Sequence, residues 1–221
     1  MSDSFMVAAR IPMSREGFEA WLSTPAAAPG PIVNPDGMFD GWLWSGRRAD
    51  TEWDSAGLGV TPREFFAEQI DASCRGESST GVLVYRDGAL EAYVFHLGYR
   101  EESIHTALLV LAAAGAHKSG PEEDTVLLWA ETSARLWPAD ATGWLAVLSV
   151  GRERARFVGT RDLTAVVAGL RPAEALFFDL VARMAEDEEN WDGDSGRPFH
   201  TDTPRDPAFM DPAVLDRPGS R

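Results

Sequence analysis

The stretch GVLVYRDGALEAYVFHL, residues 81–97, decides the fold of this chain. Two runs rich in β-branched, aromatic and aliphatic residues flank Asp87-Gly88, and such residues favour extended strands. An Asp-Gly pair between two such runs is typical of a two-residue turn whose twist matches that of paired strands. The stretch therefore predicts an antiparallel hairpin in which Tyr85 lies opposite Leu90.

The register of this hairpin sorts its side chains onto two faces, because successive side chains of a strand point in opposite directions. We expect the apolar face to be buried, and it carries Leu83, Tyr85, Leu90, Ala92, Val94 and His96. The opposite face carries Arg86, Glu91 and Tyr93. We expect solvent on that second face.

Further strands and helices surround the hairpin. The expected strands are 5–11, 125–130, 144–150 and 155–158, and residues 38–44 are compatible with one more. The clearest helix begins at Thr61, because Thr61, Pro62 and Glu64 form a capping box with proline at the first helical position. Ser14 caps an earlier helix. The other expected helices are 101–114, 162–168 and one that begins at Pro172.

These elements predict an α+β fold, a mostly antiparallel sheet with helices packed on it, because strands adjacent in sequence are joined by short turns. We expect residues 1–185 to form a single α+β domain. Residues 186–221 are expected to form an irregular acidic tail rich in proline.

The charge is concentrated in that tail. The whole chain has a net charge of −15, and residues 186–216 hold ten acidic residues and two arginines. Residues 186–216 therefore carry more than half of the net charge. We expect a mobile arm whose removal leaves folding largely intact, unless Trp191 and Phe199 pin it to the body.

A net negative charge of this size restricts which partners the protein can bind. It repels nucleic acid and anionic lipid surfaces, whereas it attracts basic proteins and speeds their association. An alternative is that the charge only keeps the protein in solution. Neither a bilayer-spanning apolar run nor a basic secretory leader is evident, and Cys74 is the single cysteine. We therefore expect a cytoplasmic protein that binds neither nucleic acid nor membrane.

The sequence carries no recognisable catalytic motif. Its histidines, at positions 96, 105, 117 and 200, lack the spacing of metal ligands, and no nucleophile motif of the G-x-S-x-G type occurs. His105 follows two glutamates near a helix start, so we expect it on a solvated face. We expect no enzyme activity, no metal and no cofactor.

Aromatic residues among acids are the more unusual feature, since the chain has eight tryptophans. Such a mixture suits an interface with a basic protein, although it could equally cover the edge of the core. The expected partner-binding residues are Asp40, Trp42, Trp44, Trp53, Asp54, Glu186, Asp187, Glu188, Glu189, Trp191, Asp192 and Asp194.

In general type the chain resembles bacterial immunity proteins that are encoded beside polymorphic toxins. The resemblance rests on the strand-helix opening FMVAARIPMSREGFEAWL, the Asp87-Gly88 hairpin, the scattered tryptophans and the acidic tail. It implies an inhibitor that neutralises a cognate, basic toxin domain by occluding its active or substrate-binding site. No family-defining motif is matched, so the resemblance assigns no role to any single residue.

The alternative is a small-ligand-binding protein or an enzyme whose site is assembled from distant residues near the 81–97 hairpin. Its candidate residues are His96, Glu91, Tyr93 and Arg100. A deep pocket beside His96 with carboxylates nearby would favour this reading. A structural or regulatory accessory protein is a third possibility.

Overall fold

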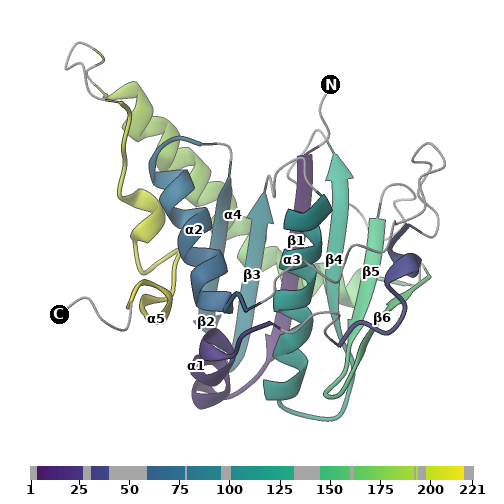
Figure 1. The fold of residues 1–221 in the computed structure, drawn as a ribbon. Coiled ribbons are helices and arrows are strands. Elements are labelled where there is room, and N and C mark those ends of the chain that lie inside the picture. The colour runs from purple at the N-terminus through teal and green to yellow at the C-terminus, as the bar shows by residue number, and fades with distance from the viewer. Residues whose placement is uncertain are drawn as a thin grey trace.

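A computed structural model describes residues 4–26, 31–39, 59–77, 79–95, 101–131, 145–159, 162–191, 193 and 198–216. Within this described part, six strands form one sheet in the order β2-β3-β1-β4-β5-β6, and every neighbouring pair is antiparallel (Figure 1). The strands are β1 (Ser4–Pro12), β2 (Thr80–Arg86), β3 (Ala89–Phe95), β4 (Asp124–Glu131), β5 (Leu145–Val150) and β6 (Ala155–Val158). The predicted α+β fold with a mostly antiparallel sheet is confirmed.

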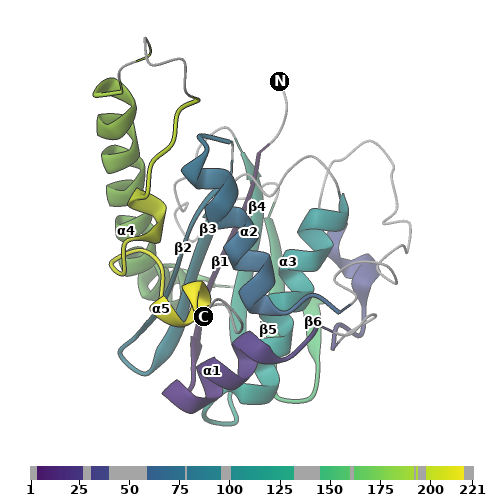
Figure 2. The ribbon, with the colours of Figure 1, turned by 60° about the vertical axis from the view of Figure 1, so that its left-hand side comes forward.

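The helices lie on both faces of this sheet. One face is covered by α1 (Arg15–Ser23), α2 (Pro62–Cys74) and α3 (Glu101–Ala113), and the other by the long helix α4 (Thr164–Glu189) (Figures 1 and 2). Short helical turns complete the described chain: η1 (Pro35–Phe39), η3 (Ala114–His117), η5 (Thr203–Arg205) and α5 (Pro212–Leu215). The sheet is therefore the middle of three layers.

The local sequence signals are realised as predicted. Tyr85 pairs with Leu90 across the β2–β3 hairpin, and Asp87 takes a positive φ of 52° in its turn. At the start of α2, the Thr61 hydroxyl accepts from the Glu64 amide while the Glu64 carboxylate accepts from the Thr61 amide. The strand considered for residues 38–44 does not begin at residue 38, because residues 38 and 39 belong to the 3₁₀ helix η1, which starts at Pro35. Residues 40–44 lie outside the described residues.

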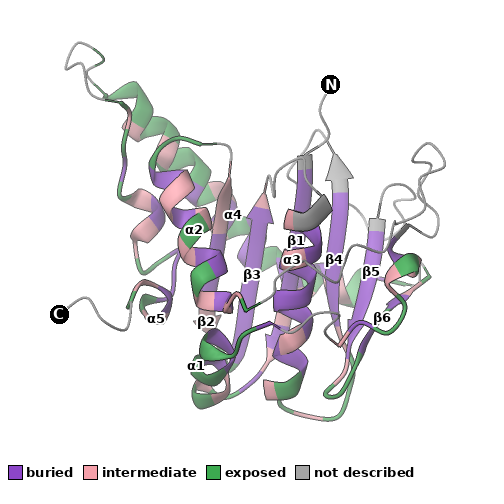
Figure 3. Ribbon diagram, viewed as in Figure 1, coloured by how far each residue is buried: buried purple, intermediate pink, exposed green. Residues whose placement is uncertain are grey.

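Because helices cover both faces, the expectation of a solvated hairpin face is wrong (Figure 3). Tyr93 is fully buried under α4, with its ring centroid 5.0 Å from that of Phe177. Glu91 is also buried, and its carboxylate accepts from Arg10 at 3.3 Å and from Arg86 at 2.5 Å. The two guanidinium groups offset the cost of burying this charge.

The last helix is longer than expected. The sequence predicts one helix over 162–168 and another from Pro172, but α4 is a single 26-residue helix with Pro172 inside it. Proline removes one backbone donor, which would leave the carbonyl of Ala168 without its usual partner. Both residues lie on the exposed side of α4, where water can bond that carbonyl, so the helix continues.

Irregular segments cover both edges of the sheet. At the β2 edge, the Leu83 amide donates to the Phe209 carbonyl at 3.0 Å, and the Leu83 carbonyl accepts from the Asp211 amide at 2.7 Å. At the β6 edge, the Asn34 side chain bonds both backbone groups of Phe157, at 3.1 and 2.8 Å. Covered edges protect a sheet from pairing with other chains.

The segment 198–216 is mostly irregular, yet it packs on the body rather than standing away from it. Phe209 and Met210 are buried, and the Asp211 carboxylate receives two hydrogen bonds from Arg15, at 2.6 and 2.9 Å. Residues 186–189, expected at the start of the tail, belong to α4 instead. The packing therefore argues against a removable arm, because truncation would expose the apolar side chains under the segment.

Phe209→Ala tests this packing. The Phe209 side chain is buried at the β2 edge with the Arg183 guanidinium 4.9 Å from its ring centroid. We expect a loss of about 3–5 kcal/mol in unfolding free energy, measured by urea denaturation. Val33→Ala is the control, since Val33 is 59% exposed and its truncation should cost under about 0.5 kcal/mol. Equal losses in the two variants would contradict a docked segment.

Candidate functional site

The candidate site is a groove between the end of α2 and the last turns of α4. The cavity there has a volume of about 350 Å³. We call it the α2–α4 groove, and the described residues that line it are Arg75, Gly76, Glu77, Thr80, Val181, Met184, Ala185, Glu188 and Phe199. Its walls come from four parts of the chain: the end of α2, the start of β2, α4, and residues 198–205, which follow α4 in the sequence and are called the returning segment.

The α2 wall depends on Gly76. The amides of Gly76 and Glu77 donate to the carbonyls of Ser73 and Ala72, both at 3.0 Å, which is the Schellman pattern that ends helices. Gly76 has a φ of 68°, and a Cβ on it would lie 2.8 Å from Cδ1 of Phe199. Position 76 therefore requires glycine for two reasons, the positive φ of the turn and the close approach of the Phe199 ring.

The α4 wall presents apolar side chains to the groove. Among the described residues, the large hydrophobic side chains that are exposed are Val33, Val181 and Trp191. Val181 lines the groove, and the Trp191 ring meets the Phe199 ring edge to face, with centroids 6.0 Å apart. Val181 thus lies on α4 itself, and Trp191 follows the end of α4 by two residues.

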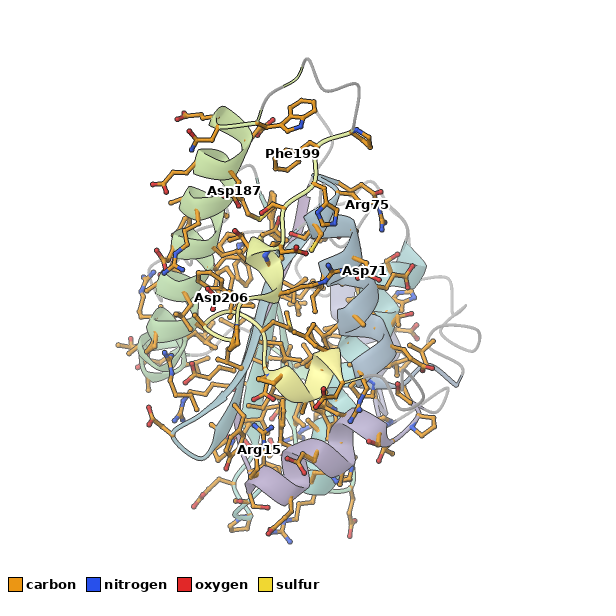
Figure 4. All side chains as sticks on the ribbon, turned by 90° about the vertical axis from the view of Figure 1, so that its left-hand side faces the viewer. Arg15, Asp71, Arg75, Asp187, Phe199 and Asp206 are labelled. Carbon is orange, nitrogen blue, oxygen red and sulfur yellow. The ribbon has the colours of Figure 1, made fainter. Side chains whose placement is uncertain are left out.

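The returning segment is fixed between α2 and α4 by polar contacts (Figure 4). The Thr201 amide donates to the Cys74 carbonyl at 2.9 Å, and the Thr201 and Thr203 hydroxyls both donate to the Asp187 carboxylate. Arg205 bonds Asp71 of α2 at 2.9 Å. These bonds hold Phe199 in place, and the hydroxyls lower the pKa of Asp187 below its usual range.

The acidic end of α4 breaks a local rule. Its last four residues are Glu186, Asp187, Glu188 and Glu189, although the C-terminus of a helix carries partial negative charge and favours cations. The threonine hydroxyls donate to Asp187 and so offset the unfavourable position of its charge. The other three carboxylates are on exposed residues. Local rules are broken most often at functional or strained sites.

The predicted partner-binding residues divide into three groups. Glu186, Glu188, Glu189 and Trp191 lie together at the end of α4, whereas Asp187 holds the returning segment. The remaining predictions fall outside the described residues: Asp40, Trp42, Trp44, Trp53, Asp54, Asp192 and Asp194. Val181 and Met184 also line the groove, although they were not among the predicted residues.

The alternative site near the hairpin gains no support from its described members. Glu91 is paired with two arginines and Tyr93 is packed against α4, and neither lines the α2–α4 groove. His96 and Arg100 lie outside the described residues. His105 was expected on a solvated face, but α3 is buried almost all round, so this side chain is 2% exposed. Burial lowers the pKa of His105 to about 4, which leaves the imidazole neutral at pH 7.

Two other cavities have charged groups that already bond their neighbours. A cavity of about 610 Å³ lies along α2, where Arg63 donates to the Asp216 carbonyl at 2.6 Å and Asp71 accepts from Arg205. A cavity of about 240 Å³ lies beside Asp124, which pairs with the buried Lys118 at 2.8 Å. Burial raises the pKa of Asp124. Arg63, Asp71 and Asp124 are therefore already bonded within the fold.

Asp187→Asn tests how the returning segment is held. The folded-state pKa of Asp187 is lowered, so its ionised form stabilises the fold above its unfolded pKa of about 4, and this contribution is lost as the pH falls below that value. We expect the variant to lose about 1 kcal/mol at pH 7, because the site is partly open to water, and to lose less near pH 3. Urea denaturation at both pH values measures this.

The control for that comparison is Glu189→Gln. It removes a charge from the same helical turn and gains the same relief from the helix dipole, but the Glu189 side chain is exposed. We expect this control to be as stable as the wild type, or slightly more stable, at pH 7. A loss that is equal in the two variants, or that is as large at pH 3 as at pH 7, would show that the Asp187 hydrogen bonds do not hold the segment.

Within the described residues, no group of three or more His, Cys, Asp and Glu side chains is placed to hold a metal ion. The described helices include none with both the length and the apolar character needed to cross a membrane. Comparison with known proteins gives no relative: no family model, no curated protein and no solved structure matches the chain.

Proposed function

We propose that this protein is a binding protein that captures a basic protein partner at the acidic end of α4. In the specific form that its general type suggests, it is an immunity protein, and the partner is a cognate toxin domain whose active or substrate-binding site it occludes. The protein then needs no catalytic group and no cofactor of its own.

The observation that carries this proposal is the acidic last turn of α4. Each uncompensated carboxylate at a helix C-terminus costs the fold about 0.3–1 kcal/mol, and neighbouring carboxylates also repel each other. A basic partner would remove both penalties, because its lysines and arginines would neutralise the exposed carboxylates of Glu186, Glu188 and Glu189. The net charge of −15 would attract such a partner over a longer distance.

The aromatic side chains beside these carboxylates support the same proposal. Trp191 is 40% exposed and its ring packs edge to face with that of Phe199, so part of the side chain is open to a partner. Tryptophan is enriched among residues that dominate binding energy at protein interfaces. Acids would set the approach and orientation of the partner, whereas the aromatic ring would supply buried area.

A triple variant, E186Q/E188Q/E189Q, separates this function from the fold. We expect it to be as stable as the wild type or more stable, because it removes three negative charges from the C-terminal end of α4, where the helix dipole is also negative. We expect its association with the basic protein encoded beside this gene to slow by about tenfold at low salt, with a weaker salt dependence. Stopped-flow association rates at two salt concentrations and thermal denaturation measure the two effects.

The matched control is D36N/E122Q/E153Q, which removes the same charge from exposed carboxylates on other elements. It should leave the association rate within about twofold of the wild type, because these charges lie away from the proposed surface. Equal slowing in the two triple variants would show that only net charge matters. No capture of the neighbouring protein by the wild type would overturn the proposed function.

A further inference from the structure

We infer that the α2–α4 groove takes a single large apolar side chain from a basic segment of the partner. This inference rests on the proposed function and names the kind of segment that the partner would present. The segment would carry one aliphatic or aromatic anchor, with lysine or arginine residues on either side of it.

The apolar part of the groove suits such an anchor. Val181, Met184 and Ala185 of α4 line it together with Phe199. The volume of about 350 Å³ is near the lower end of the range for binding pockets, about 300–1,000 Å³, so it has room for a side chain rather than for a large cofactor. Burying one such side chain there would remove apolar surface of both molecules from water.

The charges around the groove favour a basic segment and also give it a direction. On the α2 side, Glu77 is neutralised by Arg75, whose two contacts with it are 2.6 and 3.1 Å long. On the α4 side, Glu188 lines the groove and Glu189 lies one turn after Ala185. Cations of the bound segment would therefore lie along α4 rather than along α2.

The same charges disfavour two other occupants. A second copy of this chain would bring one acidic helix end against another, and like charges across an interface are costly. An acidic peptide would meet the same repulsion. A basic segment with an apolar anchor is the occupant that satisfies both the apolar floor and the carboxylates.

The groove is also formed before any partner arrives. Gly76 allows the close approach of Phe199, and the backbone bond from Thr201 to Cys74 fixes the segment that carries this ring. Met184 is tied to α2 because the Ser73 hydroxyl donates to its sulfur at 3.6 Å. A preformed groove avoids the entropy cost of ordering these groups on binding.

Ala185→Trp tests this inference by filling the groove. Its matched control is Ala182→Trp, a substitution on the same helix at an exposed residue that does not line the groove. The probes are two fluorescein-labelled 12-residue peptides of Lys, Arg and Ala, identical except for a central Leu or Ser. Anisotropy titrations at about 0.15 M salt measure the ratio of their dissociation constants.

We expect the wild type and A182W to bind the Leu peptide at least about tenfold more tightly than the Ser peptide, the effect of burying one leucine. In A185W the ratio should fall to near one. A ratio near one in the wild type, or an unchanged ratio in A185W, would overturn the inference. An acidic peptide with central Leu that binds as tightly as the basic one would overturn its charge requirement.

Val181→Ser is a second variant in case A185W does not fold, because Val181 is 40% exposed and its change disturbs the core little. It should lower the Leu-to-Ser ratio at least about threefold, and an unchanged ratio would overturn the inference. If the neighbouring protein is captured while the two peptides bind equally, this inference alone fails. If the peptides differ as expected but the neighbouring protein is not captured, the proposed function fails.

Discussion

Leu83 holds together the part of the structure on which the site depends. Both of its backbone groups pair with the C-terminal segment, the amide with Phe209 and the carbonyl with Asp211. This pairing covers the edge of the sheet and buries Phe209 beside α4. It also ties down residues 198–208, which include Phe199 and lie between α4 and α2 (Figure 4).

The position of this segment between α4 and α2 determines which carboxylates at the end of α4 are hydrogen-bonded. Thr201 and Thr203 reach Asp187, so one carboxylate of the acidic helix end becomes part of the fold. Its neighbours in the last turn of α4 are exposed and gain no such compensation from these threonines. The fold therefore tolerates an unfavourable helix end instead of neutralising it, which is the pattern expected where function rather than stability sets the residues.

Much of the fold could be predicted because its signals are local. The Asp87-Gly88 turn and the alternation around it determine the register of β2 and β3, and the Thr61 capping box determines where α2 begins. The candidate site could be predicted only in part. Its acids and Trp191 stand out by composition, whereas Val181 and Met184 look like any other members of a helical core stripe, because periodicity cannot tell which part of a stripe remains uncovered.

The sequence by itself determined the strands, most of the helices, the antiparallel character of the sheet and the place of the charge along the chain, since these depend on residues close to one another. Only the tertiary structure decided that α4 covers the second face of the sheet and buries Tyr93. It also decided that the C-terminal segment docks on β2, and that Gly76 and Phe199 meet to shape the groove. The physical reason is that these contacts join residues far apart in the chain, whose approach depends on how the whole core packs.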